Sequence, residues 1–567
     1  MAATLPIAWS RAMLADAEPR WSRLAARIAF ASFLLSVLSG LLLPIYTDEI
    51  GWRMQLRAGI DGGVDRMLSD ICGPNTIAVP PWFMMPFRHL SAWLNLTFPD
   101  PLYVRITGVA IAIGWAFLLR ALIGRIAADP QQRARLTALA FALLGMGVLP
   151  IMLVMGRPDQ IILLTMTAAL LVAAIAAQSS EAGQRPTWFW AWLWPFVIVL
   201  LGIAAISSHL KGILVAPLFL VCIGFSGTGK RSWGPRILAS LLFVAMAAQG
   251  ANYWVGRFHC PGDPVMAGRM AEENLAGALA AGDDWRTIGL AALGGANPNT
   301  YIVLAEARPR PMSEWLPNDR ISQPMMTLRY MAMSLAWNAA MLIGLICLVR
   351  ALQLCWRERR LDLATAAPVV LAGLVLVWGM SQRVKNDYEI MLVLPMLALF
   401  CIYSLSAASW SPARARQLGI VATLAVAVSF AGQIDIARRY LPSLSRAAAQ
   451  PGYVEGQHTS LSAYGYSAIR GQILATARQC GIGTHGGPHG RARHPLVDDA
   501  TYFAMTDSWQ PLHYLAVMGQ WRGTIRDPLA YLKSRGSEGM ILGCRNLSPE
   551  LRRLAIQNGE FCCIATR

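Results

Sequence analysis

The chain has 567 residues, of which 55% are hydrophobic and only 14% are charged. Soluble domains carry about 25% charged residues, so this composition excludes an ordinary soluble protein and indicates a membrane protein with some soluble mass attached. The formal net charge is +17. The Lys and Arg residues nevertheless fall in short clusters between apolar runs and form no basic stripe interleaved with aromatic residues, which argues against nucleic acid as a partner.

Apolar runs long enough to cross a bilayer follow one another along most of the chain, since a span needs roughly 20 apolar residues. About eleven spans are expected, at 27–46, 102–121, 136–155, 160–178, 187–206, 210–227, 236–254, 326–349, 363–381, 390–408 and 417–435. The first is too long for the core of a signal peptide and lacks a convincing small-residue cleavage site, so we expect it to be retained.

Basic residues mark one side of this pattern. They lie at Arg20, Arg23 and Arg27, from Arg120 to Arg135, at Arg185, at Lys230, Arg231 and Arg236, from Arg350 to Arg360, and at Arg414 and Arg416. Because positive connecting segments stay in the cytoplasm, the N-terminus is predicted inside. An odd number of spans then puts the C-terminus outside, together with the long hydrophilic segments 47–101 and 255–325.

The tail, residues 436–567, is long enough to be a domain. Its segments "HPLVDDATYFAM" and "GMILGC" have the pattern of strands, and "DPLAYLKSRG" and "SPELRRLAIQNG" that of helices, which predicts a small α/β domain. Two domains are therefore expected: a membrane module, 1–435, and this outer α/β domain, 436–567.

Cysteine positions give an independent check on sidedness. Six of the ten cysteines fall on the predicted outer side: Cys72, Cys260, Cys480, Cys544, Cys562 and Cys563. This even number fits up to three disulfides in an oxidising compartment, although the sequence does not choose among the possible pairings, and scattered free thiols are the alternative.

Charged residues recur where the predicted spans reach the outer surface. Asp48 and Glu49 follow the first span, "GRPDQ" contains Arg157 and Asp159, "SSHLKG" contains His209 and Lys211, and "SQRVKNDYE" contains Arg383, Lys385, Asp387 and Glu389. Short turns often carry solvated charges of this kind. The spans themselves hold almost none, with Arg105 as the main exception, whereas transporters usually place ionisable groups near the midplane.

This arrangement suits transfer of a sugar from a polyprenyl-phosphate donor, whose tail lies in the bilayer and whose reacting carbon lies at its surface. A carboxylate can act as the base for the acceptor hydroxyl. Arg and Lys side chains can stabilise the departing phosphate. No P-loop or Rossmann fingerprint is present, since "GTGK" at 227–230 lacks the required spacing.

Five features resemble the GT-C superfamily of membrane glycosyltransferases, which use polyprenyl-phosphate sugars outside the cytoplasm. They are the acidic pair in "YTDE" after the first span, the second acidic turn "GRPD", the segment "LGIAAISSHLKGILVAPLFL", the span "NDYEIMLVLPMLAL", and a C-terminal domain with "VDDATYFAM" and "PLHYLAVM". The turn reads "SHLKG" where the family has "LTKG". The resemblance covers most of the chain in architecture but only these motifs in residues.

The resemblance implies an inverting transfer at the outer face of a bacterial inner membrane, to a cell-envelope glycan, glycolipid or protein. It implies that Asp48 is the catalytic base, that Glu49 shares this role or orients the site, and that Asp159 assists acceptor positioning. The candidates for binding the donor phosphate are Arg157, His209, Lys211, Arg383 and Lys385. No cofactor is expected. Some members of the superfamily need a divalent metal and many do not, and none is favoured here.

Two other functions remain open. A transporter or flippase of lipid-linked saccharides explains the number of spans, but predicts polar groups within them and no large outer domain. A polysaccharide ligase or polymerase usually has one dominant outer loop and no tail domain of this size. Other signals are weaker: the histidines of "THGGPHGRARH" lack a metal-binding frame, and Trp285, Tyr301 and Trp315 either stack on sugar rings or pack loops. The sequence does not identify the sugar or the acceptor.

Overall fold

The structure is a computed structural model that describes residues 5–42, 97, 102–155, 157–181, 188–208, 211–227, 232–258, 282, 284–307, 322–359, 361–381, 385, 389–408, 410–449, 466–482, 495–498, 501, 504, 527–534 and 537–566. The residues of the predicted site that lie outside these ranges are Asp48, Glu49, His209 and Arg383. Cys72 and Cys260 also lie outside them.

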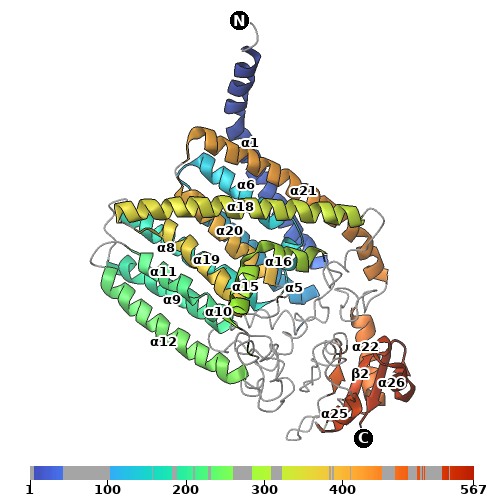
Figure 1. Ribbon diagram of the computed structural model, residues 1–567. Helices are drawn as coiled ribbons and strands as arrows, with labels where there is room; N and C mark the ends of the chain where they lie inside the picture. The colour runs from blue at the N-terminus through green and yellow to red at the C-terminus, as the bar shows by residue number, and fades with distance from the viewer. Residues whose placement is uncertain are drawn as a thin grey trace.

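Long apolar helices make up most of the described chain (Figure 1). They are α1 (Leu5–Ser39), α5 (Leu102–Ile126), α8 (Pro158–Glu181), α9 (Trp188–Ser208), α12 (Trp233–Phe258), α18 (Ser322–Glu358), α19 (Leu363–Ser381), α20 (Ile390–Ala407) and α21 (Pro412–Ala449). Each of these nine described helices contains a segment long and apolar enough to cross a membrane. The protein is therefore a polytopic helical membrane protein, as the composition predicted.

Two of the expected spans are broken helices. The run predicted at 136–155 forms α6 (Pro130–Gly145) and α7 (Leu149–Met152), and the run at 210–227 forms α10 (Lys211–Leu214) and α11 (Ala216–Phe225). A proline stands at the start of the second piece in each case, Pro150 in α7 and Pro217 in α11. Proline favours the first turn of a helix and disrupts a helix interior, which explains why both runs divide there.

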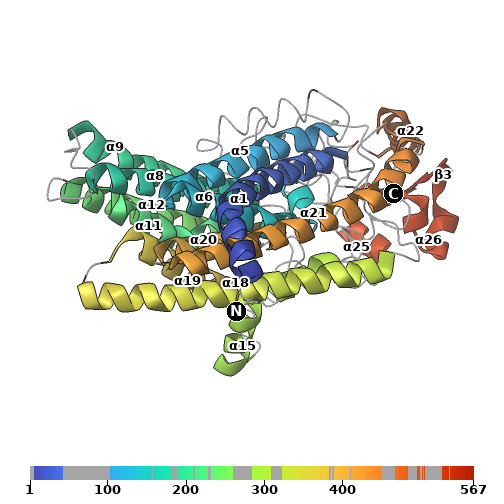
Figure 2. The ribbon, with the colours of Figure 1, turned by 90° about the horizontal axis from the view of Figure 1, so that it is seen from above.

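The centre of the bundle is formed by α6 and α20. Residues 134–145 of α6 are all buried, and so is every residue of α20 from Ile390 to Leu405. Helices α1 and α21 pack on α6, while α18 and α19 pack on α20. Seen from above, α18 lies along one side of the bundle, with α9, α11 and α12 grouped at one end (Figure 2). The outer helices expose many Leu and Val side chains, as a lipid-facing surface does.

Three exposed tryptophans lie at one end of the helices, whereas Trp285, which is also exposed, begins α15 (Trp285–Ala296). Trp190 lies in the first turn of α9, Trp233 at the start of α12, and Trp356 near the end of α18. In Figure 1 these helix ends lie on the left. Tryptophan is enriched where a membrane meets water, and this is the end that the basic clusters predicted to be cytoplasmic.

The C-terminal part of the chain contains a four-stranded sheet in the order β1–β2–β4–β3. Its strands are β1 (Leu496–Val497), β2 (Gly539–Gly543), β3 (Ile556–Asn558) and β4 (Phe561–Ala565). Strand β1 is parallel to β2, and the other two pairings are antiparallel. Helices α22 (Tyr466–Gln479), α25 (Pro528–Ser534) and α26 (Pro549–Leu554) and the 3-10 helix η7 (Cys544–Asn546) complete the described elements of this part. The expected small α/β fold is confirmed.

The segment "SPELRRLAIQNG" is only half helical. Helix α26 begins after the N-cap Ser548 and ends at Leu554, and residues Ile556–Asn558 form β3. Residues 556–558 pair with β4, whose apolar side chains are buried, so that tertiary pairing decides the local structure.

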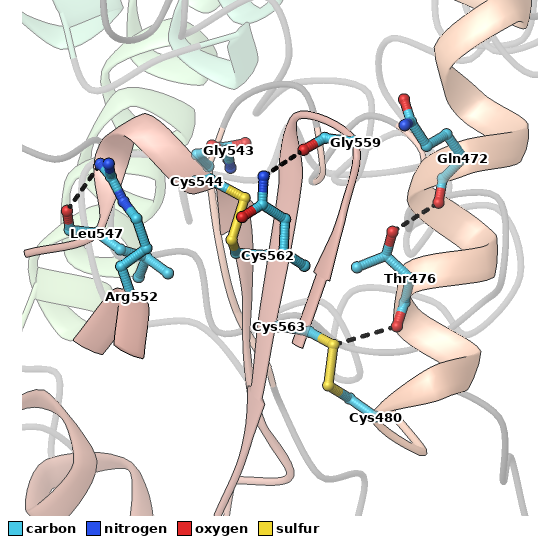
Figure 3. The surroundings of a disulfide bond; sticks show 12 residues. Gln472, Thr476, Cys480, Gly543, Cys544, Leu547, Arg552, Gly559, Cys562 and Cys563 are labelled. Carbon is cyan, nitrogen blue, oxygen red and sulfur yellow. Dashed lines mark hydrogen bonds between the residues drawn. A yellow bond between two sulfur atoms is a disulfide. The ribbon is translucent and has the colours of Figure 1, made fainter. Parts of the chain in front are cut away.

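Two disulfides fasten this sheet (Figure 3). Cys544, just after β2, pairs with Cys562 in β4, and the adjacent Cys563 pairs with Cys480, just after α22. Cys562 and Cys563 follow each other along a strand, so their side chains point to opposite faces of the sheet. One disulfide therefore joins neighbouring strands and the other attaches α22, and four of the six predicted outer cysteines are paired.

Candidate functional site

Three charged side chains meet at the start of α8. Asp159 accepts a hydrogen bond from Nε of Arg157 (3.1 Å) and another from Nζ of Lys211 (2.9 Å). All three side chains are buried, and Asp159 is fully inaccessible. We call these residues the Asp159 cluster. It joins two of the charged turns that the sequence placed at one depth, "GRPD" and "SHLKG".

The local sequence explains how the cluster forms. Pro158 begins α8, and Asp159 lies in its first turn, where the positive end of the helix dipole stabilises a carboxylate. Lys211 begins the short helix α10, and Gly212 follows it. A Cβ atom on Gly212 would lie 2.1 Å from the carbonyl oxygen of Ala205, so only glycine lets α10 lie directly on α9. This close packing directs Lys211 towards α8.

Lys211 also contacts the end of α19. Its Nζ lies 5.1 Å from the ring centroid of Trp378, within the range of a cation–π interaction. The next residue, Gly379, receives a hydrogen bond on its carbonyl oxygen from Nζ of Lys385 (2.5 Å). Lys385 thereby binds a carbonyl in the last turn of α19, where the negative end of the helix dipole favours a cation. Two of the predicted phosphate-binding lysines therefore contact the same helix end.

A second buried carboxylate belongs to the same region. Glu389 precedes α20 and is fully buried. Burial lowers the pKa of Lys385, and the negative charge of Glu389 partly offsets this effect. Burial raises the pKa of Tyr301, which lies in α16 (Pro298–Ile302), and Glu389 raises it further. The negative charge of Glu389 therefore affects the pKa of both Lys385 and Tyr301.

Arg105 lies where the first two membrane helices meet. Its side chain is buried, and Nη1 donates a hydrogen bond to the carbonyl oxygen of Gly40 (2.8 Å). Gly40 begins the short 3-10 helix η1 (Gly40–Leu42), which follows α1. Arg105, which the sequence showed near the start of the second span, therefore binds the end of the first membrane helix, a few residues before Asp48.

The predicted site residues thus divide into two sets. The structure brings Arg157, Asp159 and Lys211 into contact and places Lys385 at the same end of α19 that Lys211 contacts. Asp48, Glu49, His209 and Arg383 lie outside the described residues, so their roles stay predictions. Of the aromatic residues considered for sugar stacking, Tyr301 is buried, Trp285 is 70% exposed, and Trp315 lies outside the described residues.

Some buried charges were absent from the predicted site. Glu389 stands in the charged turn "SQRVKNDYE" but received no role. Arg329 in α18 donates to Asp435 in α21 (2.9 Å), and Arg438 also reaches Asp435 (3.3 Å). In the sequence, only Asp435 indicated this ion pair, because it is an acidic residue at the end of an apolar run. Its partner lies 106 residues away and cannot be found from local spacing.

The Asp159 cluster is suited to an anion. With two cations and one carboxylate, the named side chains carry one net positive charge in a buried setting, where electrostatic interactions are stronger than in water. A phosphate group near Arg157 and Lys211 would gain charge-assisted hydrogen bonds. Asp159 already accepts from both cations, so in this arrangement it positions them.

Within the described residues, no group of three or more His, Cys, Asp and Glu side chains is placed to hold a metal ion. Since Asp48 and Glu49 lie outside those residues, the expectation of a site without a metal stays a prediction.

No family model and no curated protein matches the chain. Among solved structures, its fold is similar to that of the Archaeoglobus fulgidus oligosaccharyltransferase in the apo form, with a TM-score of 0.43 and 11% sequence identity. The match covers 93% of this chain and 70% of that chain. With so few identical residues and so low a TM-score, the match assigns no residue role, substrate or activity.

Proposed function

We propose that this chain is an inverting glycosyltransferase of the GT-C type. It moves a sugar from a polyprenyl-phosphate donor to an acceptor hydroxyl on a cell-envelope glycan, glycolipid or protein. The observation that carries the proposal is the Asp159 cluster, because it gathers two buried cations around one carboxylate at the ends of membrane helices. A lipid-borne phosphate lies at this depth in a bilayer.

The position of the buried charges favours transfer over transport. In the described part of the bundle, the buried charged side chains lie near the ends of their helices or membrane spans; they are Arg105, Arg135, Arg157, Asp159, Lys211, Arg329, Glu389 and Asp435. A transporter usually binds its substrate near the midplane, between discontinuous helices with polar groups. Charges at the helix ends instead match a reaction that takes place at the membrane surface.

The proposed reaction assigns a role to each group. Asp48 takes the proton from the acceptor hydroxyl, whose oxygen attacks the anomeric carbon of the sugar. The bond between that carbon and the phosphate oxygen breaks, and the polyprenyl phosphate leaves with the bonding electrons. Arg157 and Lys211 stabilise the negative charge on the phosphate, and Asp159 positions both. Glu49 orients the base, while His209, Arg383 and Lys385 complete the positive surroundings of the phosphate.

The same proposal places the site at the outer face of a bacterial inner membrane. The disulfides Cys480–Cys563 and Cys544–Cys562 support an oxidising compartment for the C-terminal part, such as the periplasm. The exposed tryptophans and basic residues at the opposite helix ends support a cytoplasmic location for that end. No cofactor is proposed.

The proposal is tested with the full chain in nanodiscs and a panel of labelled polyprenyl-phosphate sugars, followed by mass spectrometry. We expect turnover of one donor by the native protein and its loss in Asp48→Asn. The matched control is Asp284→Asn, since Asp284 is an exposed N-cap of α15 (Trp285–Ala296) and asparagine caps helices equally well. Full activity in Asp48→Asn would exclude Asp48 as the base. Transport of lipid-linked saccharides without any turnover would replace the enzyme by a transporter.

A further inference from the structure

A basic cavity lies at the end of the bundle opposite the Asp159 cluster. It has a volume of about 250 Å³ and is formed by the C-terminal part of α18, the end of α20 and the first turn of α21. Three arginines line it, Arg350 and Arg357 from α18 and Arg414 from α21, and its other lining residues are uncharged. A water molecule occupies about 30 Å³, so the cavity has room for a group much larger than a single ion.

Neighbouring residues fix the shape of this cavity. Arg350 and Arg357 are seven residues apart, so they lie two turns apart on one face of α18. Trp410 lines the cavity as well, and its Nε1 donates to the carbonyl oxygen of Leu405 (2.9 Å), which holds the ring against the end of α20. The N–H groups in the first turn of α21 lie near Arg414 and add positive potential.

A lipid-facing surface leads up to the cavity. Along α18, the side chains of Leu342 and Ile346 are 60% and 45% exposed. Ile346 precedes Arg350 by four residues and therefore lies on the same face of the helix, and Leu354, which lines the cavity, is 46% exposed. Trp356, close to the cavity along the same helix, is 86% exposed. An apolar strip that ends at arginines, with an exposed tryptophan at a similar height along the helix, has the profile of a helix crossing from the hydrocarbon to the headgroup region.

We propose that this cavity binds the phosphate-bearing headgroup of an anionic phospholipid, whose acyl chains lie along the exposed face of α18. The arginines provide the charge, and guanidinium groups bind phosphate oxygens in pairs. Basic pockets between membrane helices at the cytoplasmic surface are suited to anionic headgroups. The site is separate from the one proposed for sugar transfer, and it does not depend on that function.

The test measures lipid binding to the full chain by native mass spectrometry in a mild detergent. Phosphatidylglycerol and phosphatidylcholine with the same acyl chains are titrated in parallel. The pocket variant combines Arg350→Gln, Arg357→Gln and Arg414→Gln. The matched control combines Arg20→Gln, Arg27→Gln and Arg359→Gln, which removes the same charge from exposed positions that do not line the cavity.

We expect the native protein and the control to prefer phosphatidylglycerol. Neutralising one arginine should weaken its binding about fivefold, and neutralising all three on the order of a hundredfold. Arg414→Gln alone serves as the second variant if the triple variant does not fold, with an expected loss of about fivefold. An equal loss in both triple variants would assign the binding to diffuse surface charge. Displacement of the lipid by inorganic phosphate at matching concentration would assign the cavity to a free anion, and either result overturns the proposal.

Discussion

The residues of the Asp159 cluster, which are proposed to bind the donor phosphate, should also contribute to the stability of the folded protein. Asp159→Asn would leave Arg157 and Lys211 as neighbouring buried cations without their shared carboxylate. Breaking a buried ion pair by removing one partner costs about 3–5 kcal/mol of folding free energy. We therefore expect Asp159→Asn to unfold at a clearly lower temperature than the native protein, measured by thermal unfolding in detergent.

A double-mutant cycle tests whether Asp159 and Lys211 stabilise the fold through their mutual contact or whether each substitution destabilises it independently. Combined with Lys211→Met, Asp159→Asn should cost less than the two single changes together, by about 0.5–3 kcal/mol, because the pair has then been removed as a unit. Asp284→Asn is the control and should leave the unfolding temperature nearly unchanged. Strict additivity of the two changes would contradict the contact between Asp159 and Lys211.

Lys385 should make stability depend on alkaline pH. Its pKa is lowered by burial, so the folded protein loses this proton at a lower pH than the unfolded chain does. Between the lowered pKa and the ordinary lysine value of about 10.4, the unfolded state binds more protons, and stability therefore rises with pH in that window. Below the lowered pKa, the cost of burying the charge is fully present.

The check is the unfolding temperature of the native chain and of Lys385→Met across mildly alkaline pH. The variant should lack the part of the rise that belongs to Lys385. Lys533→Met is the matched control, because Lys533 is exposed in α25, and it should keep the native profile. Identical profiles for Lys385→Met and the native protein would contradict a half-buried Lys385 with a lowered pKa.

For single residues, the sequence identified the charged turns but not which charged side chains form ion pairs between them. The order of the spans placed Arg157, Asp159 and Lys211 at one depth, because alternate turns of a polytopic chain share a side. The contact of Lys211 with Asp159 spans 52 residues and depends on the packing of α8, α9 and α10. Trp378 was missed for the same reason, since a tryptophan within an apolar run gives no sign of the lysine that it contacts.

Among the elements, α15 crosses α19 at very close range near the site. A Cβ atom on Gly295 would lie 2.2 Å from Cα of Gly379, which is too close for any side chain. Gly295→Ala must therefore push α15 away from the end of α19, where Trp378 and Gly379 contact the two lysines. We expect it to lower the unfolding temperature and to weaken binding of a polyprenyl-phosphate sugar.

The control lies in the same helix. A Cβ atom on Gly289 would meet nothing within 4 Å, so Gly289→Ala fits without displacement. Alanine is favoured over glycine in a helix by about 1 kcal/mol, so this variant should be as stable as the native protein or more so. Comparison of the two by thermal unfolding and donor binding tests the crossing. Equal behaviour would mean that the helices are farther apart.

The elements themselves were largely predictable from hydropathy, and the exceptions have local causes. The apolar runs at 136–155 and 210–227 were expected as single spans but divide at Pro150 and Pro217. Window hydropathy averages over such a break, because the residues on both sides remain apolar. In the tail, β3 was expected to be helical, since its pairing with β4 is not encoded in residues 556–558 alone.

For the whole molecule, the two ends of the bundle differ in how they carry charge. The end with the Asp159 cluster buries cations and carboxylates together, whereas the opposite end exposes arginines around a cavity and carries the exposed Trp356. Mixed buried charges suit a reaction centre that must position a phosphate and an acceptor. Exposed arginines beside tryptophan suit a lasting contact with anionic lipid. The proposed enzyme therefore reacts at one membrane surface and binds lipid at the other.

This division predicts the orientation of the chain in the membrane. Single cysteines introduced by Arg286→Cys, on α15, and by Glu358→Cys, at the end of α18, lie at exposed positions near opposite membrane surfaces. A membrane-impermeant maleimide should label Arg286→Cys in cells whose inner membrane is intact, and Glu358→Cys only after lysis, when both are compared with the unaltered chain. Basic segments remain in the cytoplasm because moving them across the membrane is costly. Glu358 lies within the strongly basic stretch 350–360, so it should be on the cytoplasmic side. The opposite labelling pattern would place the Asp159 cluster at the cytoplasmic surface, and a donor on the outer leaflet could not reach it.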